Sequence, residues 1–202
     1  MEEKNYLQDI SDIKNMMNRS SQFISLSGLS GVLAGVYALI GACIGQRLLA
    51  ANDYYYVTLE SRTFKLMVLT AFVVLVLSVL TAVVLSHFKA RKQGETTWNS
   101  TSKRMAVNFL IPLATGGIFS ILLLRHEVYG LIAPVTLIFY GLACVNASKY
   151  TLRDVRYLGI TVVILGLIAT EFSGYALEFW ALGFGVCHII YGSIMYFKYD
   201  RN

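Results

Sequence analysis

The chain has 202 residues, of which 56% are hydrophobic and only 14% are charged, and its mean hydropathy is +0.59. Soluble globular domains average about 45–50% apolar and about 25% charged residues, so this composition excludes an ordinary soluble domain. The net charge of +5 comes from short segments between apolar runs and not from one basic face with interleaved aromatic residues, which argues against a nucleic-acid partner. The sequence therefore predicts a protein whose main partner is the lipid bilayer.

Residues 1–24 form the first predicted element, a polar segment before any apolar run. At 100° per residue its apolar residues fall within one narrow arc. They are Tyr6, Ile10, Ile13, Met17 and Ile24. The pattern predicts an amphipathic cytoplasmic helix, followed by a membrane domain over residues 25–202. Two interpretations stay open, in which the helix lies on the membrane or the bundle, or pairs with a second copy of itself.

Six apolar stretches follow, each close to the length of about 20 residues that a helix needs to cross a bilayer. They lie at about 26–46, 66–87, 105–124, 129–148, 156–173 and 177–197. None alternates apolar with polar residues, and an open sheet in lipid would leave backbone groups without partners, so strands are excluded. The predicted fold is all-α, a polytopic membrane protein with six transmembrane helices.

The orientation follows from the distribution of Lys and Arg, because positive charge is retained on the cytoplasmic side. With both termini inside, the inner segments hold thirteen of these residues and the outer segments hold four, Arg47, Arg62, Lys65 and Arg125. We therefore expect a multi-pass protein with a cytoplasmic N-terminus and a cytoplasmic C-terminus. The inner loop 88–104 is basic and polar, which makes it, with the N-terminal helix, the candidate binding surface for a cytoplasmic protein partner.

The first span carries a ridge of small residues at a spacing of four, formed by Ser27, Gly31 and Gly35. Such ridges let two helices approach to backbone distance. The partner helix is either another span of the same chain or the same span in a homo-oligomer.

The third and fourth spans contain the two prolines of the chain, Pro112 and Pro134, and Gly116 and Gly117 follow the first of them. Proline removes a helix hydrogen bond and neighbouring glycines ease bending. These four residues are the candidate hinge. Broken helices expose backbone groups to substrate in transporters, although many kinks are only structural.

His188 is the ionisable residue predicted to lie deepest in the membrane, near the middle of the sixth span and beside Cys187. One interpretation is a neutral, hydrogen-bonded structural histidine. The other is a proton relay or a metal ligand.

A second set of titratable residues is predicted at the outer face, where two tight turns bring helix ends together. These residues are His126, Glu127, Glu171 and Glu178. Three carboxylates and an imidazole are able to bind a cation, but solvated helix ends also carry such groups, so metal binding stays open. No sequence motif indicates a cofactor.

The stretches SSQFISLSGLSG at 20–31, VNASKYTL at 145–152 and ALGFGV at 181–186 resemble an uncharacterised family of small multi-pass inner-membrane proteins from Bacteroides and Flavobacterium-type bacteria. The resemblance implies a bacterial inner-membrane location. It implies no activity, ligand or site residue.

Three functions remain. The first is binding or transport of a small molecule or ion through the kinked third and fourth spans, His188 and the outer carboxylates. The second is a membrane-anchored interaction or sensory protein that acts through the N-terminal helix and loop 88–104. Soluble-enzyme motifs are absent, so an intramembrane enzyme would need a pocket that joins His188 to Cys187 or to a carboxylate.

Overall fold

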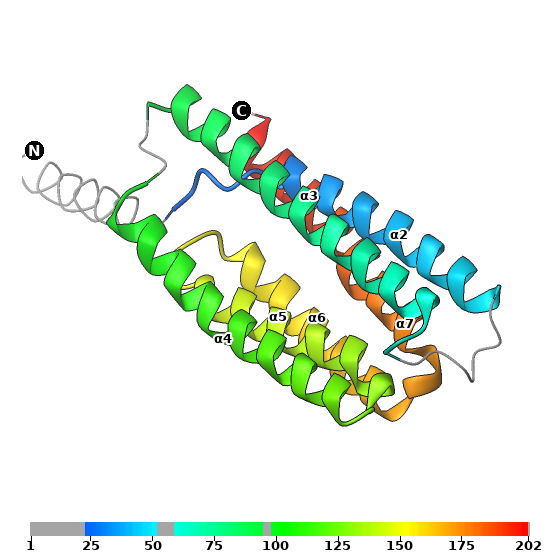
Figure 1. Cartoon of the computed structure of the whole chain (residues 1–202). Coiled ribbons are helices and arrows are strands. Elements are labelled where there is room, and N and C mark those ends of the chain that lie inside the picture. Colours follow the sequence, from blue (N-terminus) through cyan, green and yellow to red (C-terminus); the bar gives the residue numbers. More distant parts are fainter. Residues whose placement is uncertain (1–22, 52–58, 95–97, 202) are drawn as a thin grey trace, which may run out of the picture.

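A computed structural model describes residues 23–51, 59–94 and 98–201, and the main elements in these ranges are helices (Figure 1). They are α2 (Gly28–Ala50), α3 (Arg62–Lys92), α4 (Ser100–Arg125), α5 (Ile132–Ala147), α6 (Asp154–Glu171) and a C-terminal helix over Ser173–Asp200 that contains α7 (Ala176–Trp180) and α8 (His188–Met195). The all-α prediction is confirmed, and each predicted apolar stretch is a helix. Of the predicted amphipathic helix over residues 1–24, residues 1–22 lie outside the described ranges, and Phe23 and Ile24 are not helical, because the backbone of Phe23 pairs with Thr151.

Five helical segments are long and apolar enough to cross a membrane. They are Gly28–Ala50, Arg62–Lys92, Ser100–Arg125, Tyr129–Ala147 and Ser173–Asp200. α6 is more polar, since its 18 residues include Asp154, Arg156 and Glu171. All three charged residues lie near its ends.

Local hydrogen bonds fix where α3 and α4 begin. The Ser61 hydroxyl accepts from the Phe64 N–H at 3.1 Å and caps α3. Asn99 and Ser102 form a capping box, in which each side chain accepts from the other residue's backbone N–H. Because α3 continues to Lys92 and α4 begins at Ser100, residues 88–92 and 100–104 of the predicted inner loop 88–104 are helical.

The helices pack in two groups of three (Figure 1). In the first group α2 lies between α3 and the C-terminal helix, and in the second group α5 lies between α4 and α6. The C-terminal helix joins the groups through contacts with α5 and α6. The core between them contains Leu137, Leu158 and Val162.

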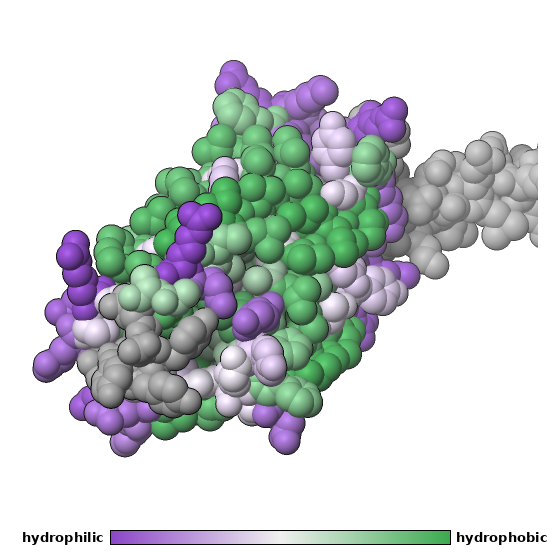
Figure 2. Space-filling view, turned by 90° about the vertical axis from the view of Figure 1, so that its right-hand side faces the viewer, coloured by the Kyte–Doolittle hydropathy of each residue, from purple (hydrophilic) through white to green (hydrophobic). Residues whose placement is uncertain are grey.

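Large apolar side chains remain on the surface, above all on α3, where Phe72 and Phe88 are each 61% exposed. Figure 2 shows a broad hydrophobic area over the upper part of the face that it displays, with hydrophilic residues around its outline and in the lower centre of the view. An apolar exterior of this size is costly in water and suits hydrocarbon. The exposure agrees with a membrane location.

The C-terminal helix is the irregular one. It begins with a 3₁₀ turn at Ser173–Tyr175, continues through α7 and becomes π-helical over Ala181–Cys187. It returns to α geometry in α8 and ends in a second π-helical segment at Tyr196–Asp200. A Cβ at Gly183 would lie 2.4 Å from the Leu137 side chain, so this segment packs tightly against α5. His188 lies directly after the first of the two π-helical segments.

Candidate functional site

His188 is buried at the start of α8 and has a hydrogen-bond partner on each ring nitrogen. Its Nδ1 lies 2.9 Å from the carbonyl oxygen of Gly183, and its Nε2 lies 2.6 Å from the hydroxyl of Tyr140 in α5. A carbonyl only accepts, so the neutral ring donates from Nδ1 and accepts from the Tyr140 hydroxyl at Nε2. The partners of this histidine are therefore neither a cysteine nor a carboxylate.

Aromatic rings surround this pair. The Phe184 ring stacks on His188 at 5.9 Å between centroids, and Phe109 of α4 meets the Tyr140 ring edge-on at 5.9 Å. In the part of the chain that the structure describes, every buried side-chain nitrogen and oxygen has a hydrogen-bond partner. The His188–Tyr140 pair thus joins α5 to the C-terminal helix, and no orphaned polar atom beside it points to a ligand.

The outer candidate residues are placed apart from this pair. His126, Glu127, Glu171 and Glu178 are all exposed. Within the described ranges, no three His, Cys, Asp or Glu side chains form a group that could hold a metal ion. An open pocket at this end is lined by apolar atoms of five residues, which are Phe172, Tyr175, Glu178, Phe179 and Leu182.

The candidate hinge residues lie in regular helices. α4 continues from Ser100 to Arg125 through Pro112, and Pro134 occupies the first turn of α5, where a missing N–H leaves no helix bond unmade. A Cβ at Gly116 would lie 2.3 Å from the Phe139 side chain, whereas Gly117 has open space around it. A hinge motion at these residues stays a prediction.

The ridge of small residues on α2 is covered by the same chain. A Cβ at Gly31 would lie 3.2 Å from the Cα of Gly192, and one at Gly35 would lie 2.6 Å from the carbonyl oxygen of Gly185. Ser27 is buried at the beginning of the same ridge. A homo-oligomer through the first span would have to use another face of α2, and it stays a prediction.

Sequence reasoning missed a buried anchor at the start of the membrane domain. Residues 23–27 run extended into the bundle, and Figure 1 shows this segment in blue, between α3 and α4. Phe23, Ser25 and Ser27 are buried, whereas Ile24 and Leu26 between them are half-buried. The sequence itself offered only the alternation of apolar Ile24 and Leu26 with Ser25 and Ser27, a period of two that is typical of an extended chain, and it did not show that the serines are the buried side chains.

Backbone and side-chain hydrogen bonds tie the segment to the turn between α5 and α6. The Phe23 N–H donates to the Tyr150 carbonyl at 2.7 Å, and the Thr151 hydroxyl donates to the Phe23 carbonyl at 2.7 Å. The Ser25 hydroxyl donates to the Gln93 side chain at 3.4 Å. The segment is therefore held from two sides.

An ion pair between Lys89 and Asp200 also holds the segment 23–27 in place. The Lys89 ammonium donates to Asp200 at 2.6 Å and to the backbone carbonyls of Ile24 and Leu26 at 3.2 and 2.9 Å. The two side chains are only 12% and 10% exposed. Removal of one partner from a charge pair buried to this extent leaves the other charge without compensation, which is strongly destabilising.

The same carboxylate caps α2. The second oxygen of Asp200 accepts from the Gly28 N–H at 2.8 Å and from the Ser27 hydroxyl at 3.3 Å. The first N–H groups of a helix lack intrahelical partners and carry partial positive charge, so a carboxylate is favourable there. The Ser27 N–H also donates to the Ser86 hydroxyl of α3 at 3.3 Å. We call residues 23–28 together with Ser86, Lys89, Gln93, Thr151 and Asp200 the N-terminal clamp.

Asp154, at the start of α6, lies at the same end of the bundle. Its carboxylate accepts from the Tyr199 hydroxyl at 2.7 Å and from the Lys198 ammonium at 3.1 Å. Partial burial by itself would raise the pKa of Asp154, but the hydrogen bonds from Tyr199 and Lys198 outweigh it and hold the pKa below its ordinary value. We call this end, which carries the clamp, the basic end.

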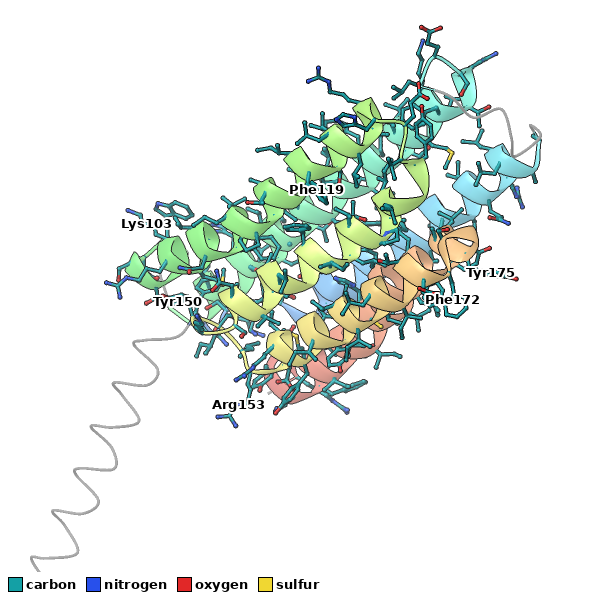
Figure 3. The ribbon with its side chains drawn as sticks, turned by 90° about the horizontal axis from the view of Figure 1, so that it is seen from below. Lys103, Phe119, Tyr150, Arg153, Phe172 and Tyr175 are labelled. Carbon is teal, nitrogen blue, oxygen red and sulfur yellow. The ribbon has the colours of Figure 1, made fainter. Side chains whose placement is uncertain are left out.

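Figure 3 shows both ends, with Lys103, Tyr150 and Arg153 at the basic end and Phe172 and Tyr175 at the opposite end. Comparison with protein-family models finds no matching family, and comparisons with curated proteins and with solved structures find no similar protein. The clamp is therefore the candidate functional site on its geometry alone.

Proposed function

We propose that this chain is a six-span protein of a bacterial inner membrane that anchors its N-terminal segment and presents it, with loop 88–104, to a cytoplasmic protein partner. The N-terminal clamp is the observation that carries the proposal. A segment that only led into a span would need no buried partners, because lipid headgroups and water satisfy its backbone. In this protein, side chains from α3, the α5–α6 turn and the C-terminal helix form hydrogen bonds with residues 23–28.

The clamp gives the N-terminal segment a mechanical link to the membrane domain. A partner that pulled on residues 1–22 would exert force on segment 23–27, which is held by Lys89 and Asp200. If that force separated the segment from them, the two groups of helices would lose a shared attachment at the basic end. A sensory or interaction protein requires such a coupling, because binding of a partner to the N-terminal segment must change the arrangement of the helices in the membrane domain.

Six spans with both termini inside are part of the same proposal. α6 packs between α5 and the C-terminal helix, and its 18 residues extend about 27 Å, close to the thickness of the hydrocarbon layer. Cytoplasmic and periplasmic reporter fusions after residues 94, 126, 150 and 174 test this topology. Cytoplasmic signals at 94 and 150 and periplasmic signals at 126 and 174 are expected, and any inversion would refute the proposed topology.

Site-specific photo-crosslinking in cells tests the partner. A photoreactive residue at Asn15 is expected to give a discrete protein adduct, and the same probe at Asn52, in the outer loop, serves as the matched control. Asp200→Ala, which opens the clamp, is expected to weaken the Asn15 adduct. The proposal fails if Asn15 gives no adduct that Asn52 lacks, or if the adduct is unchanged in Asp200→Ala.

A second candidate function is the handling of a small molecule or ion, and the His188–Tyr140 pair favours it. The pair lies at the end of a π-helical segment, and such segments occur frequently at functional sites. Flux measured in proteoliposomes should then fall in His188→Ala, Pro112→Ala and Glu178→Gln. This candidate is discarded if flux is absent or is the same in all variants.

A further inference from the structure

The basic end carries more positive charge than its own carboxylates neutralise. Among the described residues, its acids are Asp154 and Asp200, and each is engaged, by Lys198 with Tyr199 and by Lys89. Five exposed basic residues on the α4–α5–α6 side are left without a described acidic partner. We call them the basic rim: Lys103, Arg104, Lys149, Arg153 and Arg156.

The rim lies next to apolar helix surface and not next to polar surface. Lys103 is followed at intervals of four by Val107 and Ile111, which are 54% and 60% exposed. Residues four apart share one face of a helix, so the lysine stands above a column of apolar side chains. Figure 3 shows Lys103 near the beginning of α4, at the same end of the bundle as Arg153.

α6 repeats the arrangement. Arg156 is followed at the same interval by Ile160 and Ile164, which are 40% and 51% exposed. An arginine therefore stands above a second apolar column, and α5 lies between the two helices.

An amphipathic aromatic residue marks the level of the rim. Trp98 is 68% exposed, and the Lys103 ammonium lies 5.9 Å from the centroid of its ring. Tryptophan and lysine together at the end of an apolar column are typical of the headgroup level of a bilayer.

We propose that the basic rim binds the phosphate of anionic phospholipid headgroups, while the apolar columns below it contact the acyl chains. A cation above an apolar column matches a lipid, in which a charged headgroup continues into a hydrocarbon chain. A soluble acidic peptide would match the charges and leave the columns uncovered. The rim overlaps the partner surface proposed above at Lys103 and Arg104, which lie within 88–104 and in the first turns of α4, whereas Lys149, Arg153 and Arg156 lie outside that surface.

Quenching of Trp98 by brominated lipids tests this inference. Trp180→Phe leaves Trp98 as the reporter, and brominated phosphatidylglycerol is compared with brominated phosphatidylcholine in otherwise identical bilayers. A relative affinity for phosphatidylglycerol well above one is expected, and raising the salt concentration should reduce it. Equal quenching by the two lipids overturns the proposal.

Charge removal provides the matched variants. Lys103→Gln and Arg156→Gln are each expected to lower the preference for phosphatidylglycerol about five-fold, which corresponds to about 1 kcal/mol per basic residue near an anionic surface. Arg62→Gln and Arg125→Gln remove the same charge at the opposite end and should leave the preference unchanged.

Two further outcomes count against the rim. If all four variants lose the preference equally, net charge and not the rim decides it. If an acidic peptide binds the rim while phosphatidylglycerol gains no preference, the occupant is a protein and the proposal is wrong. The test is independent of the N-terminal segment, because deletion of residues 1–22 should leave the lipid preference intact even if the proposed partner does not exist.

Discussion

The two ends of the helix bundle use their polar residues in different ways. At the basic end, Lys89, Asp200 and Asp154 have short hydrogen bonds or ion pairs, and two of them hold a buried segment. At the opposite end, Glu127 and Glu178 are exposed and make no ion pair with a described residue. Similar residue types are therefore structural at one end and solvated at the other.

The difference shows that depth along a span does not decide the role of a charged residue. Asp200 and Glu178 both lie near an end of the C-terminal helix, but only Asp200 meets a helix N-terminus and a buried lysine. The role follows from what the neighbouring helices bring to that point. Substitutions at the two ends should accordingly differ most where burial differs most.

The largest effect is expected for Asp200→Ala. It leaves Lys89 buried without its ion-pair partner and removes the cap of α2, so the free energy of unfolding in detergent should fall by about 3–5 kcal/mol. Glu178→Ala is the control at the opposite end, with an expected change within about 0.5 kcal/mol. Equal effects of the two substitutions would remove the contrast between the ends. The double variant Lys89→Met with Asp200→Asn should cost less than the sum of the two single changes.

Glycine substitutions extend the comparison to packing. A Cβ at Gly28 would lie 2.3 Å from the Tyr196 backbone nitrogen, whereas Gly174 has no atom within 4 Å of that position. Gly28→Ala should therefore lower stability by about 1–3 kcal/mol through overpacking. Gly174→Ala should change it little, and thermal unfolding in one detergent compares the two directly. A tolerated Gly28→Ala would mean that α2 and the C-terminal helix separate easily at the basic end.

Tyr140→Phe tests the interior between the two ends. It leaves Nε2 of buried His188 without a donor, which should cost about 1–3 kcal/mol. Tyr191→Phe is the matched control, because its partner Thr161 keeps a hydrogen bond to the Tyr157 carbonyl. Chemical unfolding of both variants should rank Tyr140→Phe as the more damaging. The opposite order would show that the His188 ring finds another partner.

The smallest effect concerns Asp154, whose partner Lys198 is 54% exposed at the side chain. An exposed ion pair contributes about 0–1 kcal/mol. Since the pKa of Asp154 is lowered in the folded protein, its contribution is present above the ordinary carboxyl pKa and is lost as the pH falls through the lower, folded value. The melting temperature of Asp154→Asn should therefore depend less on acid pH than that of the wild type. Identical acid dependence would assign no stability to this carboxylate.

The helices were predictable because a long apolar stretch is recognised from its residue composition alone. Each predicted stretch coincides with a helix to within a few residues, apart from the longer ends of α3 and α4. Those ends are polar or basic, and hydropathy alone does not extend a helix into such residues. The Asn99–Ser102 capping box was readable from residue types, but its geometry required the fold.

The surroundings of His188 were less predictable. His188 was selected for its depth, but its partner Tyr140 lies 48 positions away in the chain, and no local pattern identifies such a pair. The prolines pointed to α4 and α5 as the irregular helices, whereas the π-helical segments of the described residues lie in the C-terminal helix. Gly183 and Gly185 were the available signal there, and they became informative only once Leu137 and Leu39 were seen beside them.

By itself, the sequence determined that the chain is helical, apolar and suited to a bilayer, because each of these properties depends on composition and short-range periodicity. Only the tertiary structure decided that residues 23–27 are extended and buried, that Asp200 joins Lys89 to the start of α2, and that the glycine ridge of α2 is covered within the chain. The physical reason is that one sequence fixes how deep a residue lies along its helix, but not which neighbour its side chain faces. That direction depends on how the other helices pack around it.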